Sequence, residues 1–235
     1  MITIVIPAFN EEARIGRTLE HYLNFFRDNV KFLVVLNGCT DGTERIVKEY
    51  AQRFPGKLSI RNLAVGAKGA ALKEGFLHAE GELVGFVDGD ESTAPEEFAK
   101  LIDAIDGVDG VIASRWMPGS VVKNRGGFRK VMSPGFVAVQ KILFGLPYRD
   151  TQCGAKIFRK KVTDTIAPML RVANMAIDVE ILWLAKKNGF RIKEVPTVWV
   201  DRMSSTIPLS PIKAIWSSLK ILKTLVALRL RFIFS

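Results

Sequence analysis

Two aspartates at the end of an apolar run are the residues best suited to chemistry. Asp88 and Asp90 follow the apolar residues 83–87 and are separated only by Gly89. Side chains two positions apart in an extended segment point the same way, so both carboxylates can face one ligand, and Gly89 keeps the turn clear of it. Their hard oxygens suit Mg²⁺ or Mn²⁺ held together with substrate phosphates. Taken alone, the pattern fits a solvated turn equally well, because Asp-Gly is common in turns.

The segment PAFNEE, residues 7–12, carries a second group of polar side chains behind an apolar run. Pro7 fixes the exit of the strand, and Phe9 offers an aromatic ring on which a base can stack. The same segment is also typical of a helix N-cap, with Asn10 followed by Glu11 and a second acid. This alternative explains the polar residues, but it does not explain Pro7 or Phe9.

Two more segments combine tight turns with helix starts. The segment NGCTDGT, residues 37–43, is typical of a turn followed by an N-cap at Thr40 or Asp41. The segment GAKG, residues 66–69, places Lys68 at a predicted helix start, where free N–H groups and a lysine favour phosphate. It matches neither a Walker A nor a GxGxxG pattern, so by itself it is a weak signal.

Around these segments, short apolar runs alternate with amphipathic ones. The predicted strands are Ile2–Pro7, Lys31–Leu36, Leu58–Asn62, Glu82–Asp88 and Gly110–Ser114. The predicted helices are Glu11–Phe26, Gly42–Arg53, Gly69–Ala79 and Pro95–Ile105. This alternation indicates an α/β fold with a mostly parallel sheet and helices on both faces. Ligands bind such sheets at the carboxyl ends of the strands, where the polar segments converge.

The second half of the chain is less regular. Residues 114–135 are rich in Gly, Pro and Arg and predict a loop. A short amphipathic helix is expected over 136–148, followed by a turn into a strand over 149–158. A helix is expected from 176 to the Asn-Gly pair that ends it, and a strand over 191–200.

The composition fits one α/β domain with an anionic partner. The 235 residues are 48% hydrophobic and carry a net charge of +10. Nucleic acid, a phosphate-bearing ligand and a membrane surface are all compatible with that charge. We expect no nucleic-acid partner, because no recognised binding motif or aromatic–basic array is present. Cys39 and Cys153 give neither a disulfide framework nor a zinc motif.

Several motifs together resemble glycosyltransferase family 2 enzymes with a Rossmann-like GT-A fold, and in particular the dolichyl-phosphate glucosyl- and mannosyltransferases. The resemblance covers about residues 1 to 200. It is carried by IVIPAFNEE, VVLNGCTDGT, GAKGAALKEGFLHAEGE, VDGDES, ASRW, LFGLPYRDTQCGAKIF and DVEILWLAKKNGFRIKEVPTVW, in that order. The segment DTQCG followed by Lys and Phe favours the glucosyl branch.

This resemblance implies a nucleotide-diphosphate sugar, UDP- or GDP-hexose, as the donor. The residues that would line the nucleoside pocket are Pro7, Ala8, Phe9 and Glu11. Asp88 and Asp90, around Gly89, would hold Mg²⁺ or Mn²⁺ against the diphosphate. We expect Lys68 or a loop arginine to assist the leaving diphosphate. Asn37 stands where the family has a base-recognising Asp. Since an amide presents one acceptor oxygen, which suits the single imide N–H of uracil, we expect UDP-glucose in preference to GDP-mannose.

The resemblance also implies an acceptor side. Arg115 and Arg129 would face an acceptor phosphate, and Gln152, Asp178 and Glu180 would belong to the shell around it. A polyprenyl or dolichyl phosphate is already anionic, so an inverting transfer to it needs no general base. A sugar hydroxyl would need one, and Asp178 is the candidate, either as base or as orienter of the acceptor. The histidines, His21 and His78, are expected to be surface or core-edge residues. A glycan-extending enzyme and a non-catalytic sugar-nucleotide-binding protein remain the alternatives.

The tail, residues 208–235, is basic and amphipathic, and we expect residues 1–200 to form the catalytic domain and 201–235 a membrane-interface tail. Its basic residues are Lys213, Lys220, Lys223, Arg229 and Arg231. No charge-free run approaches the ~20 residues that a spanning helix needs, which favours an interfacial helix. Packing of the tail on the core or on another subunit is the alternative. The opening residues are typical of a strand and not of a signal peptide, so peripheral attachment on the cytoplasmic side is expected.

Overall fold

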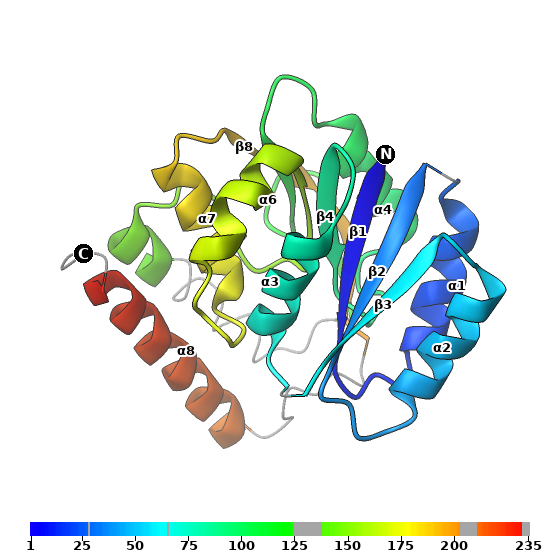
Figure 1. Ribbon diagram of the computed structural model, residues 1–235. Helices are drawn as coiled ribbons and strands as arrows, with labels where there is room; N and C mark the ends of the chain where they lie inside the picture. The colour runs from blue at the N-terminus through cyan, green and yellow to red at the C-terminus, as the bar shows by residue number, and fades with distance from the viewer. Residues whose placement is uncertain (28, 65, 125–137, 203–210, 232–235) are drawn as a thin grey trace.

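A computed structural model describes residues 1–27, 29–64, 66–124, 138–202 and 211–231. Within them, a central sheet has the strand order β3-β2-β1-β4-β7-β5-β8 (Figure 1). Its strands are β1 Ile2–Ala8, β2 Val30–Asn37, β3 Leu58–Leu63, β4 Leu83–Val87, β5 Gly110–Ser114, β7 Ala155–Arg159 and β8 Ile192–Pro196. All neighbours are parallel except β7, which runs antiparallel to both β4 and β5. The predicted α/β architecture is confirmed.

Helices cover both faces of this sheet. They are α1 Ile15–Phe25, α2 Thr43–Arg53, α3 Lys68–His78, α4 Pro95–Asp103, α6 Lys160–Ile166, the short 3₁₀ helix η1 Ala167–Met169, α7 Ile177–Lys187 and α8 Pro211–Arg231. Alternate residues of β1 point to opposite faces, as the strand period requires. Val5 packs in a core with side chains of α3, α6, α7 and α8, whereas Ile4 and Ile6 pack with side chains of α1, α2 and α4.

Helix α1 begins later than the sequence predicts. Asn10 has a φ of 51°, and its side-chain oxygen accepts a hydrogen bond from the backbone N–H of Thr40 at 2.9 Å. The N-cap interpretation of Asn10 is therefore wrong, because this residue ties the turn after β1 to the turn after β2. The N-cap expected near Thr40 or Asp41 is closer to the structure. Asp41 accepts a hydrogen bond from the N–H of Thr43, the first residue of α2, at 3.0 Å.

The predicted strand over 191–200 is two strands. After Pro196 the chain leaves the central sheet, and β9, Val198–Val200, pairs in parallel with β6, Val121–Lys123, in a small second sheet. Glu97 of α4 holds this exit, since its carboxylate accepts a hydrogen bond from the N–H of Val198 at 2.9 Å. A buried acid 101 positions away in sequence therefore binds the chain at this break, a contact that local propensity does not encode.

The C-terminal helix α8 packs against the domain along one side. Leu225 and Leu228 are buried in the core shared with α7, and Thr224 accepts a hydrogen bond from the Asn174 amide at 2.9 Å. Trp216, in contrast, is 64% exposed. No helix of the described ranges is both long and apolar enough to cross a bilayer. The expected helix over 136–148 is observed from 138 to 144, and its first two residues lie outside the described part.

Candidate active site

The polar segments singled out in the sequence meet at one edge of the sheet. Strand β1 pairs in parallel with both β2 and β4, so the carboxyl ends of these three strands lie side by side. Phe9 follows β1, Asn37 ends β2, and Asp88 and Asp90 follow β4. Lys68 begins α3, the helix that enters from the same edge. The predicted convergence is therefore present.

Asp88 is held by contacts from two distant segments. Its N–H donates to the carbonyl of Gly154 at 3.0 Å, and its carboxylate lies 2.9 Å from the Lys68 ammonium. A Cβ placed on Gly154 would lie 1.8 Å from the Asp88 Oδ2 atom, whereas one on Gly89 would meet nothing closer than 3.4 Å. Gly89 is the residue expected from the sequence to leave room for a ligand, but the close approach at Asp88 requires a glycine at position 154.

The turn after Asp90 is fixed by Glu91, which the sequence analysis missed. Glu91 has a φ of 56°, is buried, and forms ion pairs with Arg17 at 2.8 Å and with Arg202 at 3.4 Å. His21 also bonds the Glu91 carboxylate. A non-glycine residue in this conformation is strained, and these partners hold it there. Asp90 in turn accepts a hydrogen bond from the N–H of Ser92 at 2.9 Å.

Carboxylates concentrate around Asp88 and Asp90. Burial raises the pKa of Glu11 to about 7 although Arg14 lies beside it, and the charges of Asp90 and Asp88 act in the same direction. Burial likewise raises the pKa of Asp88 in spite of Lys68. A divalent cation would relieve this mutual repulsion, and hard oxygens are the ligands that Mg²⁺ and Mn²⁺ prefer. The donor set therefore fits such a cation.

The protein's share of that cation's ligands is small. No cluster of three or more His, Cys, Asp or Glu side chains arranged for metal binding occurs within the described ranges. Mg²⁺ is characteristically held by one or two carboxylates plus water and substrate phosphates. Asp88 and Asp90 are suited to that mode, in which the diphosphate completes the coordination.

Lys68 and Asp178 belong to one buried ion-pair network. The Asp178 carboxylate lies 3.2 Å from the Lys68 ammonium and 2.6 Å from that of Lys156. Burial would raise the pKa of Asp178, but Lys156 and Lys68 outweigh it and hold that pKa below its usual range. Burial would likewise lower the pKa of Lys68, but Asp178 and Asp88 raise it. An anion this well stabilised is a weak proton acceptor, which argues against Asp178 as a general base.

Phe9 and Asn37, two residues expected beside the nucleotide base, lie close together in the structure. The Phe9 ring is 44% exposed, and a Cβ on Gly66 would lie 2.8 Å from it and 3.0 Å from the Asn37 carbonyl, so the three residues are in close contact. The buried Ala8 carbonyl accepts a hydrogen bond from the Cys39 thiol at 3.3 Å, which ties β1 to the turn after β2. Pro7 is half-buried in the same strand end.

The Asn37 amide binds the protein backbone and not, as expected from the sequence, a nucleotide base. Its side-chain oxygen accepts a hydrogen bond from the Ala67 N–H at 2.8 Å, and the residue is buried. The amide thus braces the end of β2 against the start of α3. The inference that Asn37 selects uracil finds no support in this geometry, because the oxygen on which it relied already has a backbone partner.

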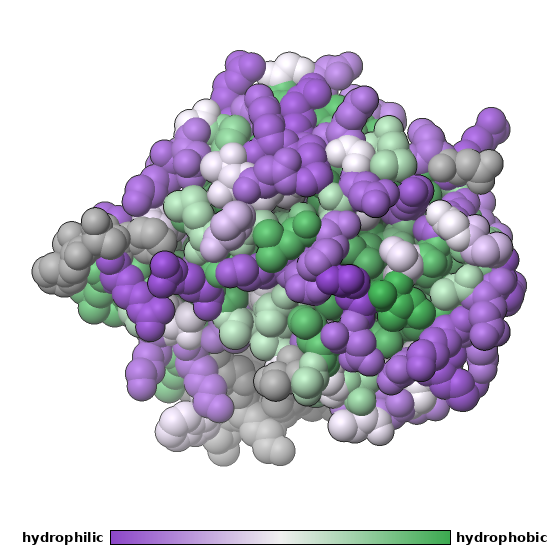
Figure 2. Space-filling view, viewed as in Figure 1, coloured by the Kyte–Doolittle hydropathy of each residue, from purple (hydrophilic) through white to green (hydrophobic). Residues whose placement is uncertain are grey.

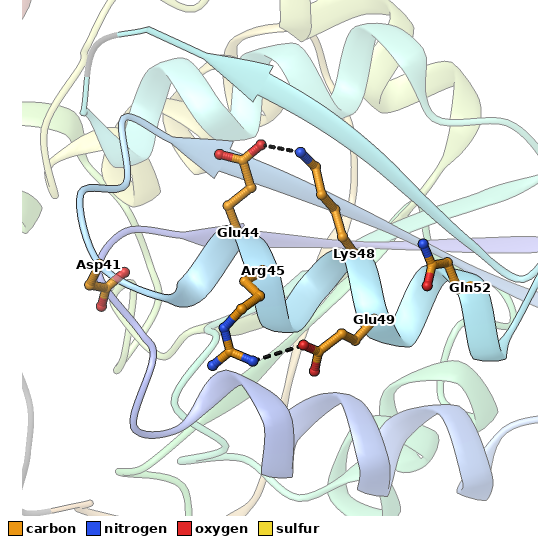
Figure 3. A pocket seen from close by; sticks show the side chains of 6 residues that line it. All are labelled: Asp41, Glu44, Arg45, Lys48, Glu49 and Gln52. Atoms are coloured by element: carbon orange, nitrogen blue, oxygen red, sulfur yellow. Dashed lines mark hydrogen bonds and ion pairs between the residues drawn. The ribbon is translucent and has the colours of Figure 1, made fainter.

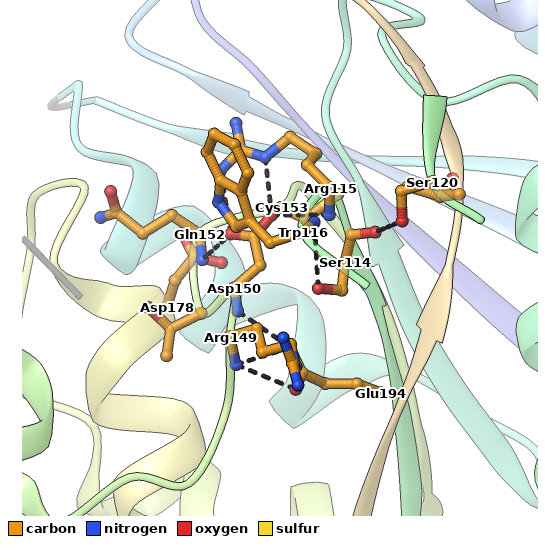
Figure 4. Close-up of polar contacts among 12 residues, drawn as sticks. Ser114, Arg115, Trp116, Ser120, Arg149, Asp150, Gln152, Cys153, Asp178 and Glu194 are labelled. Atoms are coloured by element: carbon orange, nitrogen blue, oxygen red, sulfur yellow. Dashed lines mark hydrogen bonds and ion pairs between the residues drawn. The ribbon is translucent and has the colours of Figure 1, made fainter. Parts of the chain in front are cut away.

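Arg115 is also already paired. Figure 4 shows its guanidinium against Asp150, with Nε to Oδ2 at 2.7 Å and Nη2 to Oδ1 at 2.9 Å. Burial would lower the pKa of Arg115, but Asp150 raises it. Glu194 of β8 fixes Asp150 in turn, accepting a hydrogen bond from its N–H at 2.8 Å. Arg115 thus holds the segment before Gln152, and the prediction that it faces an acceptor phosphate finds no support in this bidentate pair.

Three further residues were predicted to lie on the acceptor side: Arg129, Gln152 and Glu180. Arg129 lies outside the described residues. Gln152 is bound through its N–H to Asp150 at 3.1 Å, and its side chain reaches the Met175 carbonyl at 3.4 Å. Glu180 accepts a hydrogen bond from the Val172 N–H at 2.8 Å, so it braces the loop before α7. The sequence prediction missed Asp150, although the arginine of ASRW and the acid two positions before Gln152 were signals of an ion pair.

A hollow on the outer surface is a poor alternative site. It lies over α2 and is lined by Asp41, Glu44, Arg45, Lys48, Glu49 and Gln52 (Figure 3). Within it, Lys48 pairs with Glu44 at 2.7 Å and Arg45 pairs with Glu49 at 2.8 Å. These are the one-turn pairs of a solvated helix face, and none of the residues predicted to carry chemistry lines it.

Comparison with known proteins agrees with this geometry. The sequence pattern of the family described as Glycosyl transferase family 2 matches residues 3–167. The chain belongs to this family. A "Dolichyl-phosphate beta-glucosyltransferase" of Dictyostelium discoideum is 28% identical over 99% of this chain and 75% of its own length. A "Polyprenol monophosphomannose synthase" of Mycolicibacterium smegmatis is 30% identical over 85% of this chain and 77% of its own length. The chain is therefore a glycosyltransferase.

Solved structures show the same fold at lower identity. Glucosyl-3-phosphoglycerate synthase from Mycobacterium tuberculosis, crystallised with Mn²⁺, UDP and its product, matches 97% of this chain and 79% of its own, with a TM-score of 0.71 and 16% identity. A mannosyltransferase from Pyrobaculum calidifontis, crystallised with GDP-Man and Mn²⁺, matches 89% of this chain and 58% of its own, with a TM-score of 0.57 and 22% identity. The GT-A fold predicted from the motifs is confirmed.

Proposed function

We propose that this chain transfers glucose from UDP-glucose to dolichyl or polyprenyl phosphate, with inversion at the sugar. The observation that carries the proposal is the ion pairing of Asp178 between Lys68 and Lys156. A hydroxyl acceptor needs a general base, whereas a phosphate monoester supplies an oxygen that is already anionic. A site whose candidate base is locked in ion pairs suits the phosphate. Relatives named dolichyl-phosphate beta-glucosyltransferase, at 28% and 29% identity, support the glucosyl donor and the lipid acceptor.

The donor would lie along the carboxyl ends of β1, β2 and β4. Phe9 would stack on the base, while Asp88 and Asp90 would hold Mg²⁺ or Mn²⁺. When bound, such a cation neutralises charge that develops on the leaving diphosphate. The solved GT-A structures crystallised with Mn²⁺ support the use of a divalent cation. Lys68, whose ammonium lies 2.9 Å from Asp88, would add a second positive charge beside the diphosphate.

We further propose that α8 attaches the enzyme to the cytoplasmic face of a membrane. Leu225 and Leu228 hold one side of the helix on the domain, while Trp216 and Leu219 are 64% and 51% exposed. The exposed residues of α8 include Lys220, and Figure 2 shows hydrophilic and hydrophobic groups side by side over this helix. Apolar side chains interspersed with cations, without an acid among them, suit an anionic lipid surface. Residues 1–200 and 201–235 remain our division into catalytic domain and tail.

The activity test identifies the sugar donor and the acceptor separately. Purified protein is incubated with Mn²⁺, dolichyl phosphate and either labelled UDP-glucose or labelled GDP-mannose, and the labelled lipid is extracted. We expect glucosyl lipid from UDP-glucose and less product from GDP-mannose. A parallel incubation replaces dolichyl phosphate with a soluble sugar. Labelled product there, with no labelled lipid from either donor, would refute the lipid phosphate as acceptor.

The metal test uses two matched variants. Asp90→Asn keeps the side-chain shape but removes a charged ligand, and we expect product formation to fall by about 100-fold or more. Asp106→Asn makes the same change at an exposed position between α4 and β5 and should leave the rate unchanged. Full activity of wild type in a chelator would refute the cation's role.

The membrane test is sedimentation with vesicles of phosphatidylcholine, with and without phosphatidylserine. Reversing two charges of α8, Lys220→Glu and Lys223→Glu, should weaken binding to anionic vesicles by about 30-fold or more, at about 1 kcal/mol per basic residue. Reversing the exposed Lys48 of α2 is the control, since it lies on another part of the surface. Equal binding of all three proteins to neutral and anionic vesicles would refute the attachment through α8.

A further inference from the structure

Lys68 bridges two carboxylates that come from different parts of the fold. Its ammonium lies 2.9 Å from the Asp88 Oδ1 atom, after β4, and 3.2 Å from the Asp178 Oδ2 atom, in α7. The Lys68 side chain is only 11% exposed. An ammonium so enclosed depends on these carboxylates for its charge balance.

The negative charge of Asp178 is neutralised by a second lysine, so it does not depend on Lys68. Its second oxygen, Oδ1, lies 2.6 Å from the Lys156 ammonium, which also donates to the Cys153 carbonyl at 2.6 Å. Lys156 is fully buried, so this pair is fixed by the core of the protein. Asp88, in contrast, has Lys68 as its paired cation, and its side chain is 35% exposed.

The same Asp88 carboxylate is a proposed ligand of the divalent cation. Mg²⁺ lies 2.0–2.1 Å from its oxygen ligands, so a cation bound there would lie within a few ångströms of the Lys68 ammonium. Two positive groups on one carboxylate repel each other strongly at that distance. The cation and Lys68 therefore weaken each other's contact with Asp88.

We infer that Lys68 is the internal counter-ion of Asp88 in the donor-free enzyme and competes there with the divalent cation. A nucleotide diphosphate resolves the competition, because its oxygens offer Lys68 a new anionic partner while Asp178 keeps the ammonium within reach. The cation then binds Asp88 together with the nucleotide and binds poorly before it. This inference rests on the proposed function, since the cation and the diphosphate are parts of it.

The test measures Mn²⁺ binding without turnover, by loss of the electron paramagnetic resonance signal of free Mn²⁺. In the absence of nucleotide, Lys68→Met should bind Mn²⁺ about fivefold or more tighter than wild type, because the competitor is gone. With saturating Mn²⁺, the same variant should bind UDP about tenfold or more weaker, because the diphosphate loses a charged partner. Lys68→Arg keeps the charge and should keep the wild-type affinity for Mn²⁺.

Lys73→Met is the matched control. It removes the same charge from the same helix, but its ammonium donates to the Leu170 carbonyl at 2.9 Å, and within the described residues it forms no ion pair with Asp88, Asp90 or Asp178. Its Mn²⁺ affinity should stay within about twofold of wild type, as expected for a distant, screened charge. Circular dichroism checks that each variant is folded, and Lys68→Gln replaces Lys68→Met if the latter is not.

The two possible failures are distinguishable. If donor-free Lys68→Met binds Mn²⁺ no tighter than wild type, while wild type binds Mn²⁺ with UDP, the counter-ion inference is wrong and the proposed function stands. If wild type binds no Mn²⁺ even with UDP, the cation site itself is wrong and the inference fails with it.

Discussion

Gly154 is the position where a single methyl group should disable the site. A Cβ there would lie 1.8 Å from the Asp88 Oδ2 atom, and Cβ contacts shorter than 3.0 Å essentially never occur. In Gly154→Ala the oxygen must therefore move by at least 3.0 minus 1.8, or about 1.2 Å. A displacement of about 1 Å in a reacting geometry can cost about 100-fold in rate. We expect transfer to fall by about that factor.

The cost in stability should be modest by comparison. Overpacking by one methyl group costs about 1–3 kcal/mol, which for a chain of this size lowers Tm by about 2–12 °C. The assays are initial rates of labelled lipid formation at saturating Mn²⁺ and a thermal melt followed by circular dichroism. A folded variant that has lost its rate identifies displacement of Asp88, not unfolding, as the cause.

Gly16→Ala is the matched control for this prediction. The same methyl group on α1 would meet its nearest neighbour, Ile46, at an ordinary 3.5 Å. In a helix this change should be neutral or stabilise the protein by up to about 1 kcal/mol, with the rate unchanged. If Gly154→Ala retains the wild-type rate as Gly16→Ala does, the close approach does not matter for catalysis and the reasoning is refuted.

Three further changes probe the charges around the site. Lys156→Met leaves Asp178 with one cation fewer in the core and should lower the free energy of unfolding by about 3–5 kcal/mol; a loss below 1 kcal/mol in urea titration would contradict this. Arg115→Lys cannot keep the bidentate contact with Asp150 and should cost about 1.5–3 kcal/mol, so an unchanged Tm would count against it. The pKa of Glu11 rises from 4.5 to about 7 on folding, so folding favours its protonated form. The contribution of Glu11 to the stability of the metal-free protein should therefore be greatest below pH 4.5 and should be lost as the pH rises through 7. Glu11→Gln should remove this decline, which is measured as urea midpoints from about pH 5 to 8.

The periodicity of the chain predicted most of the first half of the fold. Strands and helices through 114 are present close to their predicted ranges, because apolar runs and amphipathic runs each satisfy one local geometry. The antiparallel direction of β7 between β4 and β5 was not predicted. A strand's own residues specify that it is extended and buried, but not which neighbours receive its hydrogen bonds.

For the site, too, the sequence predicted some features and left others undetermined. Residue type and spacing were enough to predict that Asp88 and Asp90 lie at a strand end that faces a ligand, because the carboxyl ends of parallel strands lie at the same edge of the sheet. The partners of Asn37, Arg115 and Asp178 could not be obtained in that way. Each is bound by a group that is distant in sequence, as Lys68 is from Asp178 across 110 positions.

The sequence by itself therefore determined which chemical groups this glycosyltransferase has and at which end of the sheet they stand. Only the tertiary structure decided which of them are available to a ligand and which are already paired. The physical reason is that a buried charge must find its counter-charge wherever the fold supplies it, and Asp178 finds Lys156 and Lys68 from separate elements. Because of these ion pairs, Asp178 is a stabilised carboxylate and a poor general base.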